Sequence, residues 1–259
     1  GMNYKSADTG EIFLMKYFDK EDVSFLEDSC NVRMGDNYFI GNLKNYKISL
    51  SPEDFDGFGI NINLTSKLNP YRPQDGIIKA GDDYFAWLSA VPNGVVSGDL
   101  VVNGKSTKLS GSGYHDHNWG NTPLQYLFDD WVWFRGEIED KTIVAAVLYM
   151  TDKRGGYDVP ILYIADSSKV HVNKFGEDGL YTRKSTSITD LYNKHNEPLF
   201  RELDMITEDG FRVNIIGNSV LDNSNLFKRG RMPYPIRLAM GAATVSYTHL
   251  RAHETEADL

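Results

Sequence analysis

Residues 95–109 decide the fold: VVSGDLVV at 95–102, then Asn103-Gly104, then KSTKL at 105–109. The runs on both sides of Asn103-Gly104 are strand-like, because β-branched and apolar residues recur there in short segments bounded by turn residues. A two-residue type I′ turn needs positive φ at both central positions, and Asn-Gly is a strongly favoured sequence for it. The stretch therefore predicts an antiparallel β-hairpin with its turn at Asn103-Gly104.

The chain from Tyr38 onward repeats this pattern in short alternating or apolar runs separated by turn residues. One such turn is expected at Pro92-Asn93-Gly94. The runs recur at roughly 8 to 12 residues, which favours a sandwich or barrel over βαβ units. The sequence therefore predicts an all-β fold of antiparallel strands. Besides the hairpin, the expected strands are 38–40, 46–50, 58–64, 84–91, 130–138, 142–151, 159–165, 185–189, 203–207 and 211–216.

The composition of the 259 residues is that of a folded protein rich in sheet. Hydrophobic residues make up 41% and charged residues 24%, which excludes disorder, collagen and coiled coil as descriptions of the whole chain. With a formal net charge of -9, the chain lacks the excess of positive charge with which nucleic-acid-binding proteins neutralise phosphates. No apolar run is long enough for a membrane span. We therefore expect neither a nucleic-acid partner nor a transmembrane segment.

Cysteine usage indicates a reducing compartment. The single cysteine, Cys30, excludes an intramolecular disulfide and a cysteine-based zinc site. The sequence also contains no glycine-rich phosphate loop, GxSxG elbow or HExxH helix. We expect a cytoplasmic protein that works without a cofactor.

Residues 111–121 (GSGYHDHNWGN) hold an unusual density of polar and aromatic side chains for a β protein. Alternation along a strand separates even from odd positions, so Asp116 is expected to point away from His115 and His117. A metal site of the His-x-His type needs a third ligand, which the sequence does not identify, so no metal is expected. The alternative is a polar strand end whose buried hydrogen bonds brace the fold.

The segment YHDHNWG at 114–120, with PNGVVSGDL at 92–100 and WVWFRG at 131–136, resembles the carotenoid 1,2-hydratase (hydroxyneurosporene synthase) and AttH-type family. The likeness is specific over residues 84–150 and elsewhere is only a similarity of strand pattern. It implies two consecutive lipocalin-like β-barrel or sandwich domains, which we place at 1–115 and 116–245, with the motif near their junction. Members of the family are longer than this chain, so the second domain is expected to be truncated.

Residues 246–259 (SYTHLRAHETEADL) break the strand pattern. They have helical propensity, little apolar periodicity and a likeness to translated sequencing-adapter read-through. We therefore interpret them as a non-native-looking tail outside both domains.

The resemblance implies hydration, cyclisation or isomerisation of a hydrophobic, isoprenoid-like or polyketide-like substrate. Protonating an isolated alkene needs a carboxylic acid that an apolar setting keeps protonated. Asp116 is the expected donor, with His115 and His117 to orient it, return its proton or steer water. Aromatic faces beside it would stabilise positive charge. The expected substrate-binding residues are Tyr114, Asn118, Trp119, Trp131, Trp133 and Arg135.

Structural explanations stay open for several of these residues. A buried Arg135 needs a partner, for which Asp116 and Glu137 are the nearest candidates, and the tryptophans are equally suited to core packing. Two other functions also stay open: a carrier that binds a lipid or other hydrophobic small molecule without converting it, and an interaction protein with a filled core. The sequence fixes neither the substrate nor the oligomeric state.

Overall fold

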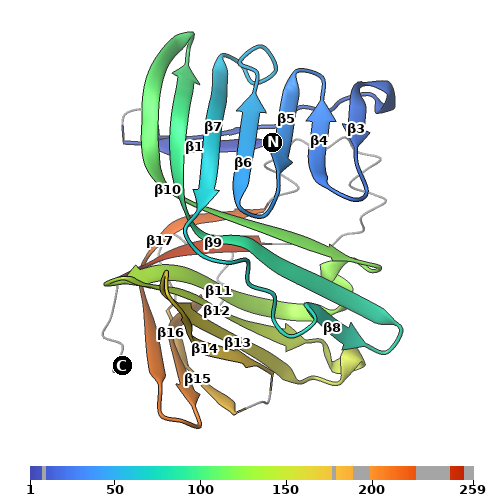
Figure 1. Cartoon of the computed structure of the whole chain (residues 1–259). Helices are drawn as coiled ribbons and strands as arrows, with labels where there is room; N and C mark the ends of the chain where they lie inside the picture. Colours follow the sequence, from blue (N-terminus) through green and yellow to red (C-terminus); the bar gives the residue numbers. More distant parts are fainter. Residues whose placement is uncertain (8–9, 177–178, 189–198, 226–245, 254–259) are drawn as a thin grey trace. The chain divides into compact units, whose positions relative to one another are not determined.

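The computed structural model describes residues 1–259 except 8–9, 177–178, 189–198, 226–245 and 254–259 (Figure 1). Its regular elements are strands, apart from three short 3-10 helices within the described residues. The strand pairs with a defined register are antiparallel. The all-β, antiparallel fold class predicted from the sequence is confirmed. None of the described helices is long and apolar enough to cross a membrane.

The strands up to the hairpin are β1 (Met2–Ser6), β2 (Gly10–Leu14), β3 (Val23–Phe25), β4 (Cys30–Met34), β5 (Asn37–Gly41), β6 (Asn45–Leu50), β7 (Phe58–Ser66), β8 (Ile77–Ala80), β9 (Asp83–Val102) and β10 (Lys105–Gly120). The later strands are β11 (Phe128–Ile138), β12 (Lys141–Met150), β13 (Asp158–Ala165), β14 (Val170–Phe175), β15 (Leu180–Ile188), β16 (Leu199–Thr207), β17 (Arg212–Asn225) and β18 (Ser246–His253). The 3-10 helices are η1 (Lys20–Asp22), η2 (Leu124–Tyr126) and η3 (Asp152–Arg154).

These strands form four sheets. The largest is eight-stranded, with the order β10-β9-β7-β6-β5-β4-β3 and with β8 paired to β9. Strands β11 to β14 and β15 to β18 form two sheets of four strands in sequence order, and β1 pairs with β2. Figure 1 shows β3 to β7 following one another across the large sheet. The four strands before Tyr38 were not expected from the sequence pattern.

The hairpin that decides the fold is present. Strand β9 ends at Val102 and β10 begins at Lys105, and Asn103 and Gly104 have φ of 50° and 77°. Positive φ at both central residues is what a type I′ turn requires. The turn predicted at Asn103-Gly104 is therefore confirmed.

The turn expected at Pro92-Asn93-Gly94 is wrong, because these residues lie buried within β9. The carbonyl of Asn93 accepts a hydrogen bond from the backbone N–H of Lys67 at 2.8 Å. A Cβ atom on Gly94 would lie 2.7 Å from Cδ1 of Leu64. The glycine therefore permits close packing within the sheet, and this tertiary requirement overrides the local turn signal.

The chain folds into two compact units. Unit 1 comprises residues 1–71 and 88–117, and unit 2 comprises residues 72–87 and 118–259. One buried cluster of unit 1 consists of Tyr46, Leu64, Ala90 and Val91. The domain limits of 1–115 and 116–245 remain a prediction, and residues 226–245 lie outside the described part of the chain.

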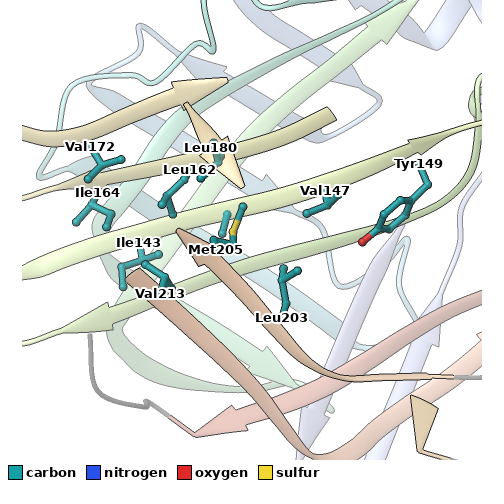
Figure 2. Close-up of a cluster of buried hydrophobic side chains, with 11 residues drawn as sticks. Ile143, Val147, Tyr149, Leu162, Ile164, Val172, Leu180, Leu203, Met205 and Val213 are labelled. Carbon is teal, nitrogen blue, oxygen red and sulfur yellow. The ribbon is translucent and has the colours of Figure 1, made fainter. Parts of the chain in front are cut away.

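The core of unit 2 is built by the two four-stranded sheets (Figure 2). Strands β12, β13 and β14 contribute one set of side chains, and β15, β16 and β17 contribute the set that meets it. The register of β12 with β13 puts Ile143 opposite Ile164 and Ala145 opposite Leu162, so one face of this sheet is continuously apolar. The labelled members are Ile143, Val147, Tyr149, Leu162, Ile164, Val172, Leu180, Leu203, Met205 and Val213.

The helical propensity of the chain end does not produce a helix over residues 246–253. These residues form β18, which pairs with β17 through two register shifts. The remaining residues of the tail, 254–259, lie outside the described part of the chain. Its interpretation as non-native stays a prediction.

Candidate functional site

Strand β10 carries the whole YHDHNWG segment. Its approach to the sheet depends on Gly113, the residue just before the motif. A Cβ atom at this position would lie 2.6 Å from Cγ2 of Val96 and 2.8 Å from Cδ1 of Leu64. These distances are too short for a side chain, so glycine lets β10 pack tightly where the motif begins.

Tyr114 and Asp116 lie on the same face of β10 and are both half-buried. The hydroxyl of Tyr114 donates a hydrogen bond to Oδ2 of Asp116 at 3.1 Å. Such a bond is strongest when the acceptor is a carboxylate. Asp116 therefore has a neutral hydrogen-bond donor directed at its carboxyl group.

His115 lies on the opposite face of β10, within the aromatic packing of unit 1. Its ring centroid is 4.8 Å from that of Phe39 and 4.8 Å from that of Tyr46. Burial lowers the pKa of His115, while the charge of Asp116 acts to raise it and His117 acts to lower it. The structure thus gives His115 a packing role beside the hydrogen-bonded pair on the other face.

The Tyr46 ring in this cluster rests against Gly41. A Cβ atom on Gly41 would lie 1.9 Å from Cδ1 of Tyr46, so the ring occupies the space that any other side chain would need. Tyr46 is only 2% exposed, and burial raises the pKa of its hydroxyl. The cluster of Phe39, Tyr46 and His115 is therefore a packed support for β10.

The second half of the motif is more open. His117 and Asn118 are exposed, and the division between the two units falls between them. Trp119 is half-buried, and the Arg72 guanidinium lies over its ring with Cζ 5.4 Å from the centroid. This geometry is a cation–π interaction.

Trp131, Trp133 and Arg135 share one face of β11. The intervening residues Val132 and Phe134 pack against the core of unit 2, so the three side chains lie on the sheet's other face. Trp133 remains 44% exposed. The three positions singled out in the sequence are therefore presented together, away from the apolar core.

Arg135 has a partner on its own strand. Its Nη2 donates to Oε1 of Glu137 at 2.7 Å, an ion pair between residues two apart on one face of β11. Glu137 was one of the two partners considered from the sequence, and this contact is confirmed. The carboxylate of Glu137 thus compensates the charge of a guanidinium whose side chain is only 17% exposed.

Sequence reasoning missed Phe39, Tyr46 and Arg72. Phe39 and Tyr46 fell within expected strands, and Arg72 follows Tyr71 in a segment without a clear strand signal. No local pattern connects them with the YHDHNWG motif, because each contact joins residues at least 47 positions apart on different elements.

Within the described residues, no group of three or more His, Cys, Asp or Glu side chains has the geometry to hold a metal ion. The expectation of chemistry without a metal remains a prediction.

The region that contains the motif is similar to known proteins. Residues 75–176 match the family model described as carotenoid hydratase CrtC. A curated relative is the quinolone epoxide rearrangement protein asqO of Emericella nidulans, which is 36% identical over 53 residues. That alignment covers 20% of this chain and 14% of the relative, so the chain matches only a small part of that protein.

Two solved structures share the fold. An AttH-like protein of Nitrosomonas europaea superposes with a TM-score of 0.56 at 14% identity, over 77% of this chain and 61% of the other. Kievitone hydratase of Nectria haematococca gives a TM-score of 0.50 at 14% identity, over 76% and 61% of the two chains. The resemblance read from the sequence is confirmed: this chain carries a carotenoid hydratase CrtC match at residues 75–176 on an AttH-like, all-β fold.

Proposed function

We propose that this chain is a lipocalin-like enzyme in which Asp116 protonates a hydrophobic, isoprenoid-like or polyketide-like substrate. The observation that carries the proposal is the hydrogen bond from Tyr114 to Asp116, because it lies inside the region that matches carotenoid hydratases. The relatives are named for hydration and for epoxide rearrangement. Delivery of a proton to an uncharged substrate is a chemically sound first step for both reactions.

A single carboxyl group can catalyse hydration, because it first gives a proton and later regains one. Asp116 donates its Oδ1 proton to an alkene carbon, so a C–H bond forms, the π bond breaks and a carbocation remains. The carboxylate left behind keeps the Tyr114 hydrogen bond on Oδ2. Water then forms the C–O bond, and its surplus proton returns to the carboxylate. In a cyclisation or isomerisation, an internal double bond or the loss of a neighbouring proton replaces the water.

The remaining residues take different parts in this proposal. His117 is exposed and next to Asp116, which suits exchange of the returning proton with solvent. His115 supports the strand through Phe39 and Tyr46 and orients Asp116 only indirectly. The proposed substrate-binding residues remain Tyr114, Asn118, Trp119, Trp131, Trp133 and Arg135.

The pairing of Arg135 with Glu137 bears on its proposed role. A guanidinium whose charge is matched by a carboxylate contacts an apolar ligand chiefly through its planar face and aliphatic stem. Arg135 is therefore proposed to orient the substrate by packing. A hydrophobic small molecule as the ligand, no cofactor and a cytoplasmic location remain parts of this proposal.

An enzyme is favoured over a carrier because the relatives are named for reactions. The test incubates the protein with an acyclic carotenoid that has a terminal isoprenoid double bond, with kievitone and with a quinolone epoxide, each in isotopically labelled water. Mass spectrometry then distinguishes hydration, which adds labelled oxygen, from rearrangement, which leaves the mass unchanged. We expect conversion of at least one substrate by the unmodified protein and loss of conversion in Asp116→Asn.

Binding measured on the same panel separates the alternatives. Retained binding by Asp116→Asn, together with lost conversion, supports the acid role. Binding without conversion by the unmodified protein indicates the carrier instead. Equal conversion by both proteins excludes Asp116 as the proton donor.

A further inference from the structure

Arg72 is held in a specific path across the backbone of unit 2. A Cβ atom on Gly76 would lie 2.5 Å from Nε and 2.6 Å from Cγ of Arg72, so the arginine side chain passes directly over this glycine. Gly76 is buried and has a φ of +75°, a conformation that favours glycine. Its backbone is fixed on both sides, since its N–H donates to Pro73 at 2.6 Å and its carbonyl accepts from Trp87 at 2.9 Å.

The path over Gly76 brings the guanidinium to Trp119. Cζ of Arg72 lies 5.4 Å from the indole centroid, within the range of a cation–π interaction. In the described part of the chain, Arg72 takes part in no ion pair.

A cation on one face changes what an indole ring can do at the other. The guanidinium already uses the negative electrostatic potential of the ring, and a second positive charge opposite it would be repelled. Trp119 is thus poorly suited to the stabilisation of positive charge that the sequence suggested for aromatic faces beside Asp116. A ring with one face covered by a cation can contact an apolar ligand only through its other face or its edge.

We propose that Arg72 is a positioning residue: it fixes the indole of Trp119 as an apolar wall that orients the hydrophobic substrate. The assignment of Trp119 to substrate binding rests on the proposed function, whereas the contact between Arg72 and the indole does not. The two statements are therefore tested by separate measurements.

The first measurement is the indole N–H spectrum of nitrogen-labelled protein. The chain has four tryptophans, and Trp119→Phe identifies which signal belongs to Trp119. Arg72→Met keeps an aliphatic stem but removes the charge, so we expect it to shift the Trp119 signal and leave the other three in place. An unchanged Trp119 signal would overturn the positioning role, whatever the catalytic role of Asp116.

The second measurement is the affinity for Nile red, an uncharged hydrophobic probe, with KM and kcat added for any substrate found to turn over. Arg72→Met should raise the Kd or KM by roughly twofold to fivefold, the range of an exposed cation–π contact, and leave kcat nearly unchanged. Arg72→Lys should restore most of the loss. An unchanged Kd and KM despite a shifted indole signal would show that the contact is only structural and would overturn the proposal.

Arg33 provides a matched control. Its Cζ lies 5.7 Å from the ring centroid of Tyr38, so Arg33→Met removes a comparable cation–π contact from unit 1. This variant should leave the Trp119 signal and the Nile red affinity unchanged. If it alters them as much as Arg72→Met does, the effects are not specific to Trp119 and the proposal fails.

Discussion

Asp116 on β10 and Asp204 on β16 are both carboxylates within strands, but their surroundings differ. Asp116 is half-buried and accepts a hydrogen bond from the neutral hydroxyl of Tyr114. Asp204 is 2% exposed and is bound by two guanidinium groups and an amide. The cations that hold Asp204 favour its charged form, whereas the hydrogen bond to Asp116 comes from a neutral group.

The Asp204 network shows what a structural acid looks like in this chain. Nη2 of Arg183 lies 3.0 Å and Nη2 of Arg212 lies 3.1 Å from Oδ2, and Asn214 donates to Oδ1 at 2.5 Å. Burial by itself acts to raise the pKa of Asp204, but the bonds from Asn214, Arg212 and Arg183 bring it below its ordinary value. The network joins β15, β16 and β17 on the face away from the core.

The largest effect is expected for Asp116→Asn. The amide is nearly isosteric with the carboxyl but has no acidic proton, so turnover should fall by about a hundredfold or more. Binding and melting temperature should stay close to those of the unmodified protein, as measured by probe titration and calorimetry. An unfolded variant would instead show that Asp116 is a structural acid like Asp204.

Asp204→Asn should have the opposite profile. Loss of the charge weakens two ion pairs that are partly open to solvent, so we expect a stability loss of about 1 to 2 kcal/mol. For a chain of this size, the melting temperature falls by roughly 2 to 4 °C for each kcal/mol. Asp140→Asn, at an exposed position, is the control and should melt like the unmodified protein. A selective loss of turnover in Asp204→Asn would break the comparison.

Tyr114→Phe tests the neutral donor itself. It removes the hydroxyl that stabilises the Asp116 carboxylate after proton transfer, and turnover should fall by about tenfold, or about 1.4 kcal/mol. The test is kcat for the substrate identified in the panel, with Nile red binding as the check on integrity. If kcat is unchanged, the Tyr114 hydrogen bond contributes nothing to the reaction.

The smallest effect concerns the other face of β10. Burial holds the folded pKa of His115 below the value of about 6.5 in an unfolded chain, so the unfolded state takes up the proton first as pH falls. The stability linked to His115 is therefore full above about pH 6.5 and decreases below it. His115→Phe should remove this part of the acid sensitivity, because a phenyl ring suits the cluster with Phe39 and Tyr46 and carries no titratable group.

Urea unfolding at about pH 7.5 and about pH 5.5 measures this difference. The packing role of His115 is contradicted if His115→Phe loses stability on acidification as much as the unmodified protein does.

The strand predictions succeeded where local pattern and tertiary packing agree. The Asn103-Gly104 turn formed because its sequence allows positive φ at both residues. The prediction failed at Pro92-Asn93-Gly94, because these residues lie within a continuous strand. There the glycine allows Leu64 to pack closely against the backbone. A turn-type sequence allows the backbone conformations of a turn, but packing against the neighbouring strand determines whether the turn forms.

The sequence by itself determined the all-β class, the hairpin and the separation of Asp116 from His115 on β10, because these depend on backbone sterics and on period-two alternation. Only the tertiary structure decided that His115 packs on Phe39 and Tyr46, that Arg135 pairs with Glu137 and that Arg72 covers Trp119. The contacts of His115 and Trp119 join residues far apart in the chain, and even the Arg135 pair depends on which of two acids lies within reach. Periodicity tells which face of a strand a side chain occupies, but the group it meets there depends on how the sheets curve and pack.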